Sequence, residues 1–177
     1  MKKMVSYLYM QGGASAVFQQ GEYVVYADSG LCLVEQVGVP DFSGSDRSKT
    51  YYFLRSVEDG SRIYVPTDTH MPLRAPMTAE EAERLLASIA DLPVAPPHSR
   101  DRKTVQQHYQ ALMRPHTPEA LAQTVKTIRR REAPGRMTSV EEAVLRRAEQ
   151  QLYGELACAL GVSEEDAAGR LRAELTA

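Results

Sequence analysis

The stretch FQQGEYVVYADSGLCLVEQV, from Phe18 to Val37, decides the fold of the first half of this chain of 177 residues. It contains two short runs rich in Val, Leu and Tyr, and this composition is typical of β-strands. Asp28-Ser29-Gly30 lies between the runs and can form a tight turn. The pattern therefore predicts two strands joined by a tight turn.

Two further runs of this kind follow, YYFLRSV from Tyr51 and RIYVP from Arg62, with Glu58-Asp59-Gly60 between them. A polar, glycine-containing loop spans residues 40–49. Four or five short strands in about 60 residues are too few for a two-sheet sandwich, whereas a small, strongly curved barrel can close its own edges. We expect such a barrel over residues 17–76.

The second half carries helix start signals. Thr78-Ala79-Glu80-Glu81 and Ser139-Val140-Glu141-Glu142 match the capping box, in which a Ser or Thr and a later Glu satisfy each other's backbone N–H groups. Thr117-Pro118 supplies an N-cap and a proline at the first helical position. The segment from Asp101 to Met113 is also expected to be helical.

The longest predicted helix begins at the second capping box and ends at Gly161, and Ser163 starts a last helix. Its apolar stripe consists of Leu145, Ala148, Leu152, Leu156 and Ala159. Helices that are apolar on one side only must pack against one another, so we expect an antiparallel bundle over residues 77–177. The expected fold is α+β in two domains, a small β-barrel followed by an all-α bundle.

Residues 1–16 fit neither half and precede a well-patterned start at Val17. Gln11-Gly12-Gly13 can be encoded by a purine-rich string shortly upstream of Val17, and GTG is a permitted bacterial start codon. We hypothesise that residues 1–16 are a leader or tail that is not native. The intact mass of protein made from the native gene would test this.

Composition excludes several classes of protein. With 43% hydrophobic and 25% charged residues the chain can bury a core, and no apolar run is long enough to span a bilayer. Cys32 and Cys158 are isolated, which favours small buried side chains over a disulfide or a metal pair. The four histidines lack ligand spacing, and no nucleophile–base, Walker or paired-carboxylate motif is present. We therefore expect no metal, no cofactor and no catalysis.

Although the net charge is only −2, the charged residues are distributed in three blocks of different sign. Residues 17–76 carry five basic and eight acidic side chains, residues 98–147 carry eleven and five, and residues 148–177 carry two and six. A basic block between acidic ones is expected if one face of the chain meets a polyanion, and a solvated helical surface is the alternative. Charge alone leaves both open.

Five motifs occur in a fixed order: FQQGEYVVYADSGLCLVEQV, YYFLRS, IYVPTD, LRAPMTAEEAERLL and LRRAEQQLYGELACALGV. In this combination the chain resembles the CarD/CdnL family of bacterial transcription regulators from about Val17 onward. The resemblance implies a Tudor-like barrel, shared with the transcription-repair coupling factor, that docks on the β subunit of RNA polymerase. It also implies a helical bundle that contacts promoter DNA at the upstream edge of the melted region. Members of the family are not enzymes and recognise no operator sequence; they stabilise the open complex, commonly with a tryptophan in the minor groove.

This chain has no tryptophan. Against the bridge motif W-I-x-D-x-K of similar members, HSRDRK sets His98 where the tryptophan stands, and a register matched on the following helix sets Arg102 there instead. Histidine can stack on a base or sugar, and arginine can enter a narrowed minor groove electrostatically. We expect weaker stabilisation of the open complex than in members with the tryptophan, or a different promoter preference.

Cations near this position are the candidate DNA contacts. Arg100, Arg102 and Lys103 surround Asp101, the expected helix cap. Cations at a helix start oppose the macrodipole, which makes phosphate contact as good an explanation as a solvated turn, and both stay open. Arg129-Arg130-Arg131 ends a helix, where cations are favoured in any case, so DNA contact and a solvated helix end both stay open. Pro96-Pro97 is expected to set the approach of the helix that follows.

Arg62, Tyr64 and Pro66 are the candidate polymerase contacts, because they lie on a strand that ends near the domain join. Strand alternation places Ile63 and Val65 inside the barrel and Arg62 and Tyr64 outside it. An exposed strand edge can pair with a partner's sheet, and the resemblance favours this contact over a plain core strand.

The sequence therefore predicts a monomeric, cytoplasmic, non-catalytic regulator that bridges the polymerase β subunit and promoter DNA. The missing tryptophan leaves open a polymerase-binding adaptor whose helical domain recruits another protein. A small hydrolase with an unrecognised histidine site is disfavoured by the lack of a nucleophile–base motif. Whether the effect is activation or repression, and at which promoters, does not follow from the sequence.

Overall fold

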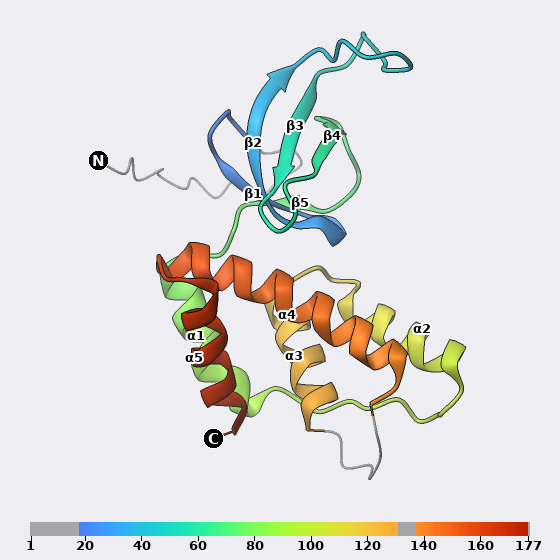
Figure 1. Cartoon of the computed structure of the whole chain (residues 1–177), viewed down its shortest axis with the longest axis vertical. Coiled ribbons are helices and arrows are strands. Elements are labelled where there is room, and N and C mark those ends of the chain that lie inside the picture. The colour runs from blue at the N-terminus through green and yellow to red at the C-terminus, as the bar shows by residue number, and fades with distance from the viewer. Residues whose placement is uncertain (1–17, 131–136, 177) are drawn as a thin grey trace.

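The computed structural model describes residues 18–130 and 137–176, and of Asp28 only the backbone. The hypothesised leader and the start at Val17 lie outside these residues. Figure 1 shows a curled sheet placed over a group of helices. We call residues 18–76 the sheet region and the described residues from 77 onward the helical region.

The sheet contains five antiparallel strands in the order β4-β3-β2-β1-β5. The strands are β1 (Tyr23–Tyr26), β2 (Gly30–Gly38), β3 (Tyr51–Ser56), β4 (Arg62–Pro66) and β5 (Leu73–Arg74). All four predicted runs form strands, and β5 was not predicted. It is too short to show an alternating pattern, and it forms because its backbone pairs with β1.

The sheet is strongly curled but open. β4 and β5 are its two edges and do not pair with each other, so within the described residues the sheet is a half-barrel rather than the closed barrel that we expected. A break in register between Val34 and Gln36 of β2 adds to the curvature, as β-bulges do. The concave side buries its own small core, made of Val24, Cys32, Val34, Tyr52, Leu54 and Val65.

The helices are α1 (Ala79–Ser88), α2 (Arg102–Met113), α3 (Pro118–Arg129), α4 (Ser139–Leu160) and α5 (Glu164–Thr176), with short 3₁₀ turns η1 (Ala27–Ser29) and η2 (Ile89–Asp91). Most predicted end signals are confirmed. Thr78 forms a full capping box with Glu81, and Thr117 caps α3 with Pro118 in its first turn. Gly161 ends α4 with φ of +66°. No helix of the described residues is both long and apolar enough to span a bilayer.

The start of α4 differs by one residue from the predicted capping box. Thr138 is the N-cap instead of Ser139: its hydroxyl accepts from the backbone N–H of Glu141, whose carboxylate accepts from the backbone N–H of Thr138 at 2.8 Å. Both registers satisfy the sequence pattern. Glu141 is buried and also accepts from the hydroxyl of Tyr109 at 3.5 Å, so tertiary contacts select the register.

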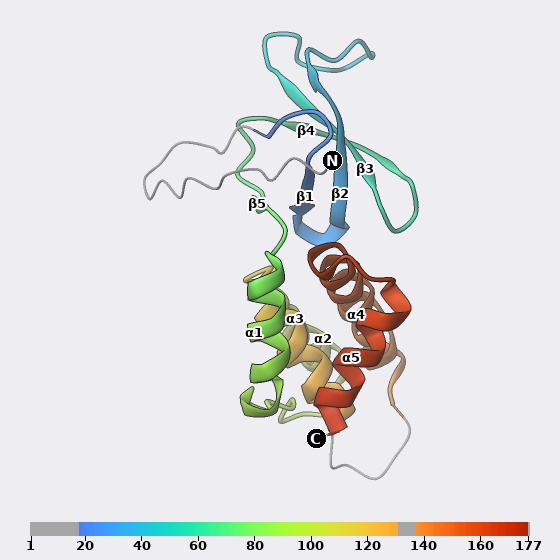
Figure 2. The same cartoon turned by 90° about the vertical axis from the view of Figure 1, so that its left-hand side faces the viewer.

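The helices do not form the antiparallel bundle that we expected. α4 contacts each of the other helices and runs across α1 and α3 (Figure 1), while α1 and α5 lie side by side and run in the same direction (Figure 2). α2 and α4 also run in the same direction. Each of these pairs is separated in sequence by at least one other helix, so no short loop forces its members to be antiparallel.

Arg74 and the β1–β2 turn join the sheet region to α4. Arg74 of β5 makes a bidentate ion pair with Glu155 of α4, with Nη1–Oε1 and Nη2–Oε2 distances of 2.5 and 2.8 Å. The β1–β2 turn lies against α4 (Figure 2), where Gly30 has φ of +66° and an added Cβ would lie 3.1 Å from Cγ of Gln151. These contacts fix the sheet on the helices.

Candidate functional site

The segment that carries His98, residues 92–101, is anchored to α3 at its start. Lys126 of α3 is only 5% exposed, and its Nζ donates to the carbonyl oxygens of Ala90 and Leu92 at 2.7 and 2.6 Å. A buried ammonium requires such partners because burial removes its water. Lys126 therefore fixes the point at which the chain leaves η2.

Ala95 is held from two sides. Thr127 Oγ1 accepts from its backbone N–H at 3.2 Å, and Nε2 of His108 lies 2.6 Å from its carbonyl oxygen. This second contact requires the proton on Nε2, because a carbonyl oxygen only accepts. Pro96 and Pro97 follow directly, each with a restricted φ. The anchor and the two prolines together direct the chain toward α2.

His98 and Arg100 lie beyond this anchor and are exposed. Arg102 and Lys103 are the first two residues of α2 and are exposed as well. None of these four side chains pairs with another residue in the part of the chain that the structure describes. The structure therefore leaves four of the predicted DNA contacts exposed, just before and at the start of α2.

Asp101 is the N-cap of α2, as predicted. Its carboxylate accepts from the backbone N–H and from the hydroxyl of Thr104, both at 2.9 Å. The backbone hydrogen bond, followed by the hydroxyl, lowers the pKa of Asp101 below its ordinary value. The cap is thus ionised at neutral pH, and it neutralises only part of the charge of Arg100, Arg102 and Lys103.

The second predicted cluster is placed differently. Arg129 donates from Nε to Glu149 Oε1 at 2.7 Å and forms an ion pair with it. Arg130 is the C-cap of α3 and donates from Nε and Nη2 to the carbonyl oxygen of Leu175, at 3.1 and 2.7 Å. Arg131 lies outside the described residues. Arg129 and Arg130 thus connect α3 to α4 and to the end of α5.

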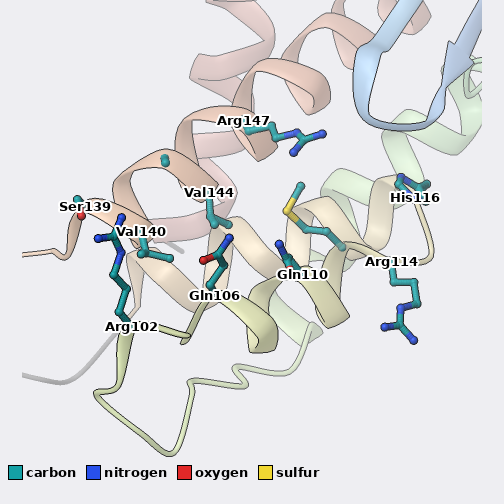
Figure 3. Close-up of a pocket in the computed structure, with 11 residues that line it drawn as sticks. Arg102, Gln106, Gln110, Arg114, His116, Ser139, Val140, Val144 and Arg147 are labelled. Carbon is teal, nitrogen blue, oxygen red and sulfur yellow. The ribbon is translucent and has the colours of Figure 1, made fainter. Parts of the chain in front are cut away.

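A groove of about 600 Å³ lies between α2 and α4 (Figure 3). It is lined by Arg102, Gln106, Gln110, Met113, Arg114, His116, Ser139, Val140, Ala143, Val144 and Arg147. Three of these residues are arginines and none is acidic. Arg102 lies at one end, Arg114 and Arg147 lie at the other, and Gln106 and Gln110 lie between them (Figure 3). The groove is therefore electropositive.

Apart from Arg102, the sequence did not point to these groove residues. One signal was available: Arg102, Gln106, Gln110 and Arg114 recur every four residues, which places them on one face of α2. The opposite wall could not be found in this way, because it depends on α4 packing beside α2.

β4 offers an open backbone edge. It pairs with β3 alone, and Ser56 N donates to the carbonyl of Ser61 at 2.9 Å just before the strand. Because hydrogen-bonded pairs alternate in an antiparallel ladder, the backbone N–H and C=O groups of Arg62 and Tyr64 point away from β3, toward this edge. Pro66 occupies the next equivalent position and has no N–H to offer.

An aromatic cluster lies beside this edge. Tyr64 is 44% exposed, and its ring centroid lies 4.8 Å from that of Phe42 and 5.2 Å from that of Phe53. Arg62 is exposed too, with Nε 3.5 Å from a carboxylate oxygen of Glu35. These residues line a hollow of about 330 Å³ on the outer face of the sheet. The predicted alternation of β4 is confirmed, with Val65 buried on the opposite face.

Comparison with known families identifies the sheet region. Residues 18–74 match the family described as the CarD-like/TRCF RID domain. The sheet region is similar to CarD-like RID domains over these residues, and we refer to it below as the RID domain. This match confirms the CarD-like resemblance, and RID domains of this family interact with the β subunit of RNA polymerase. A search of curated proteins finds no match for the chain.

The RID domain contains all five strands, including the edge strand β4 with Arg62, Tyr64 and Pro66. The match ends before α1, so it does not extend to the helical region. The RID domain therefore supports a transcription-related function. The family match gives no information on the role of the helical region, for which the exposed residues of that region are the available observations.

Proposed function

We propose that this protein is a non-catalytic transcription regulator that docks on the β subunit of bacterial RNA polymerase and contacts promoter DNA to stabilise the open complex. The RID domain match carries the proposal. In this view a Tudor-like sheet domain, residues 17–76, and a helical DNA-contacting domain, residues 77–177, act as one monomer in the cytoplasm, where the polymerase works.

The β4 edge is the proposed polymerase contact. Addition of a partner strand to an open edge supplies main-chain hydrogen bonds, and side chains beside the edge supply specificity. Arg62 and Tyr64 are placed for both roles, since their backbone groups are open and their side chains are exposed. Tyrosine and arginine are also the residue types that most often carry binding energy at protein interfaces.

His98, Arg100, Arg102 and Lys103 are the proposed DNA contacts. Docking of the RID domain raises the effective concentration of these residues at the promoter, so weak and sequence-neutral phosphate contacts suffice. A tenfold shift between closed and open complexes requires only about 1.4 kcal/mol of differential binding. Arg129 and Arg130 have internal partners, so we assign the DNA contact chiefly to the first cluster.

In this proposal His98 or Arg102 takes the position of the wedge at the fork, and His98 is smaller and more polar than tryptophan. An indole buries far more apolar surface between bases. We therefore propose that this protein prolongs the open complex less than family members that carry the tryptophan.

The lifetime of a promoter complex with polymerase tests the proposal. His98→Trp is expected to lengthen the lifetime, and Arg102→Ala is expected to shorten it by removing a phosphate contact. Arg84→Ala, which removes an exposed arginine from α1, is the matched control and should leave the lifetime unchanged. Tyr64→Ala should weaken recruitment to polymerase itself.

The adaptor alternative makes a different prediction in the same experiment. If the protein binds polymerase but leaves the promoter lifetime unchanged, and if fork-junction DNA is not retained in a salt-dependent manner, the helical region recruits a protein rather than DNA. If the unmodified protein does not bind polymerase at all, both the regulator and the adaptor function are contradicted.

A further inference from the structure

The α2–α4 groove carries polar residues along the whole length of α2. Phosphate contact at the start of α2 alone does not explain these residues. Its α2 wall presents Arg102, Gln106, Gln110 and Arg114 in a row, so that charges stand at the ends and amides in the middle. At 1.5 Å of rise per residue, the two arginines are about 18 Å apart along the helix. Neither arginine side chain, and neither glutamine side chain, pairs with another described residue.

The α4 wall is apolar where the α2 wall carries amides. Val140, Ala143 and Val144 form this wall, and Arg147 closes it at the far end (Figure 3). The volume of about 600 Å³ is within the range of ligand-binding clefts. Polar groups on one side and apolar side chains on the other suit a ligand that has both hydrogen-bonding edges and apolar faces, as nucleobases do.

The direction of the two helices sets which residues share an end of the groove. α2 and α4 run in parallel, so Arg102 and Ser139, their first residues, lie at one end (Figure 3). The helix N-termini themselves are capped by the acidic side chains of Asp101 and Glu141. The positive charge at the two ends of the groove therefore comes from the arginines, and the middle is neutral.

We propose that the α2–α4 groove binds an unpaired segment of a DNA strand. A span of about 18 Å corresponds to roughly five nucleotides at 3.4 Å per nucleotide of a stacked strand, so phosphates can reach the arginines at both ends. Gln106 and Gln110 can pair with base edges, as glutamine amides do. This inference rests on the proposed function and specifies which form of promoter DNA the helical region holds.

The concave shape favours an unpaired strand over a duplex. Base edges of a duplex lie inside its grooves, and a protein element reaches them by projecting into the groove. Gln106 and Gln110 instead face a hollow bounded by α4, so the bases have to enter the protein. The residues that line the groove include no Phe, Tyr or Trp. Binding therefore depends on charge and on guanidinium stacking, and it should be sensitive to salt.

Fluorescence anisotropy with the full-length protein tests the proposal. The probes are a short labelled single-stranded oligodeoxynucleotide, the matched duplex and a free nucleoside triphosphate. We expect the single strand to bind more tightly than the duplex. Gln106→Ala with Gln110→Ala should weaken single-strand binding about fivefold or more. Arg114→Ala should lower the slope of log affinity against log salt by about 0.7, the contribution of one phosphate contact on a single strand.

Two exposed neighbours outside the groove provide controls, Gln107→Ala on α2 and Arg146→Ala on α4. Neither should change the affinity as the groove variants do. Equal binding of duplex and single strand, binding of the free nucleotide as tight as that of the oligonucleotide, or equal effects of groove and control variants would each overturn the proposal. The full-length protein is also tested for polymerase binding and for its effect on promoter lifetime. If it binds polymerase and prolongs the promoter complex but fails the anisotropy tests, only the groove proposal is wrong. If it does neither, the proposed function is wrong.

Discussion

The ion pair between Arg74 and Glu155 is expected to be the strongest single link between the sheet and helical regions. Glu155 is 1% exposed, and its carboxylate accepts from both terminal nitrogens of Arg74 and from the backbone N–H of Met77 at 2.9 Å. Arg74→Met keeps most of the aliphatic packing but leaves this carboxylate buried without its counter-charge. Removal of one partner from a buried pair typically costs about 3–5 kcal/mol.

We expect a value near the lower end, about 3 kcal/mol, because the Arg74 side chain is 30% exposed and water can reach part of the site. Glu155→Gln should cost less, about 2 kcal/mol, since the amide oxygen can still accept from Met77 while the charge-assisted bonds are lost. Urea unfolding followed by circular dichroism measures both. If the free energy of unfolding falls by about 2 kcal/mol per molar urea, Arg74→Met should lower the urea midpoint by about 1.5 M.

Arg170 and Glu83 provide the matched control, because they form an equally bidentate pair between α5 and α1 at 3.0 and 2.6 Å. Both side chains are about half exposed, at 43% and 54%, and exposed pairs are screened by water and salt. Arg170→Met should therefore shift the midpoint far less than Arg74→Met. If the two variants lose the same stability, burial is not the source of the effect and the reasoning is refuted.

Three further predictions concern single positions. Gly30→Ala should lower the free energy of unfolding by about 1–3 kcal/mol, because φ is +66° and Gln151 fills the space that a Cβ needs; an unchanged urea midpoint would contradict this. Burial raises the pKa of Cys32 to about 11, so at neutral pH a thiol reagent should label exposed Cys158 and reach Cys32 only after unfolding, whereas fast labelling of both would argue against it. Asp101 has a lowered pKa, so its cap contributes stability above the unfolded pKa of about 3.9 and loses it as the pH falls through the lower folded value. The unfolding midpoint of Asp101→Asn should therefore depend less on acidic pH than that of the unmodified protein. If both proteins show the same dependence of the midpoint on pH, the Asp101 carboxylate does not stabilise the helix as proposed.

Local patterns in the sequence predicted the elements and several of their ends. Thr78, Asp101, Thr117 and Gly161 were identified as helix boundaries because a cap depends on residues within a few positions of itself. The outward position of Arg62 and Tyr64 followed from strand alternation in the same way. The α+β class followed from these local patterns, whereas the RID domain was anticipated by the CarD-like resemblance of the ordered motifs.

Tertiary structure decided the features that depend on residues far apart in the chain. Arg74 and Glu155 are separated by 81 positions, and each alone would be taken for a solvated surface charge. Lys126 was missed for the same reason, since its buried partners are backbone carbonyls that no residue pattern reveals.

The α2–α4 groove shows the division most clearly. The sequence determined the polar stripe of α2, because spacing along one helix is a local property. Only the packing of α4 in parallel beside α2 turned that stripe into one wall of a groove, since helix direction and contact depend on how the apolar faces of all five described helices bury one another. The residue types that line the α2 wall of the groove therefore follow from the sequence. The shape of the groove follows from the way in which the helices pack around their common core.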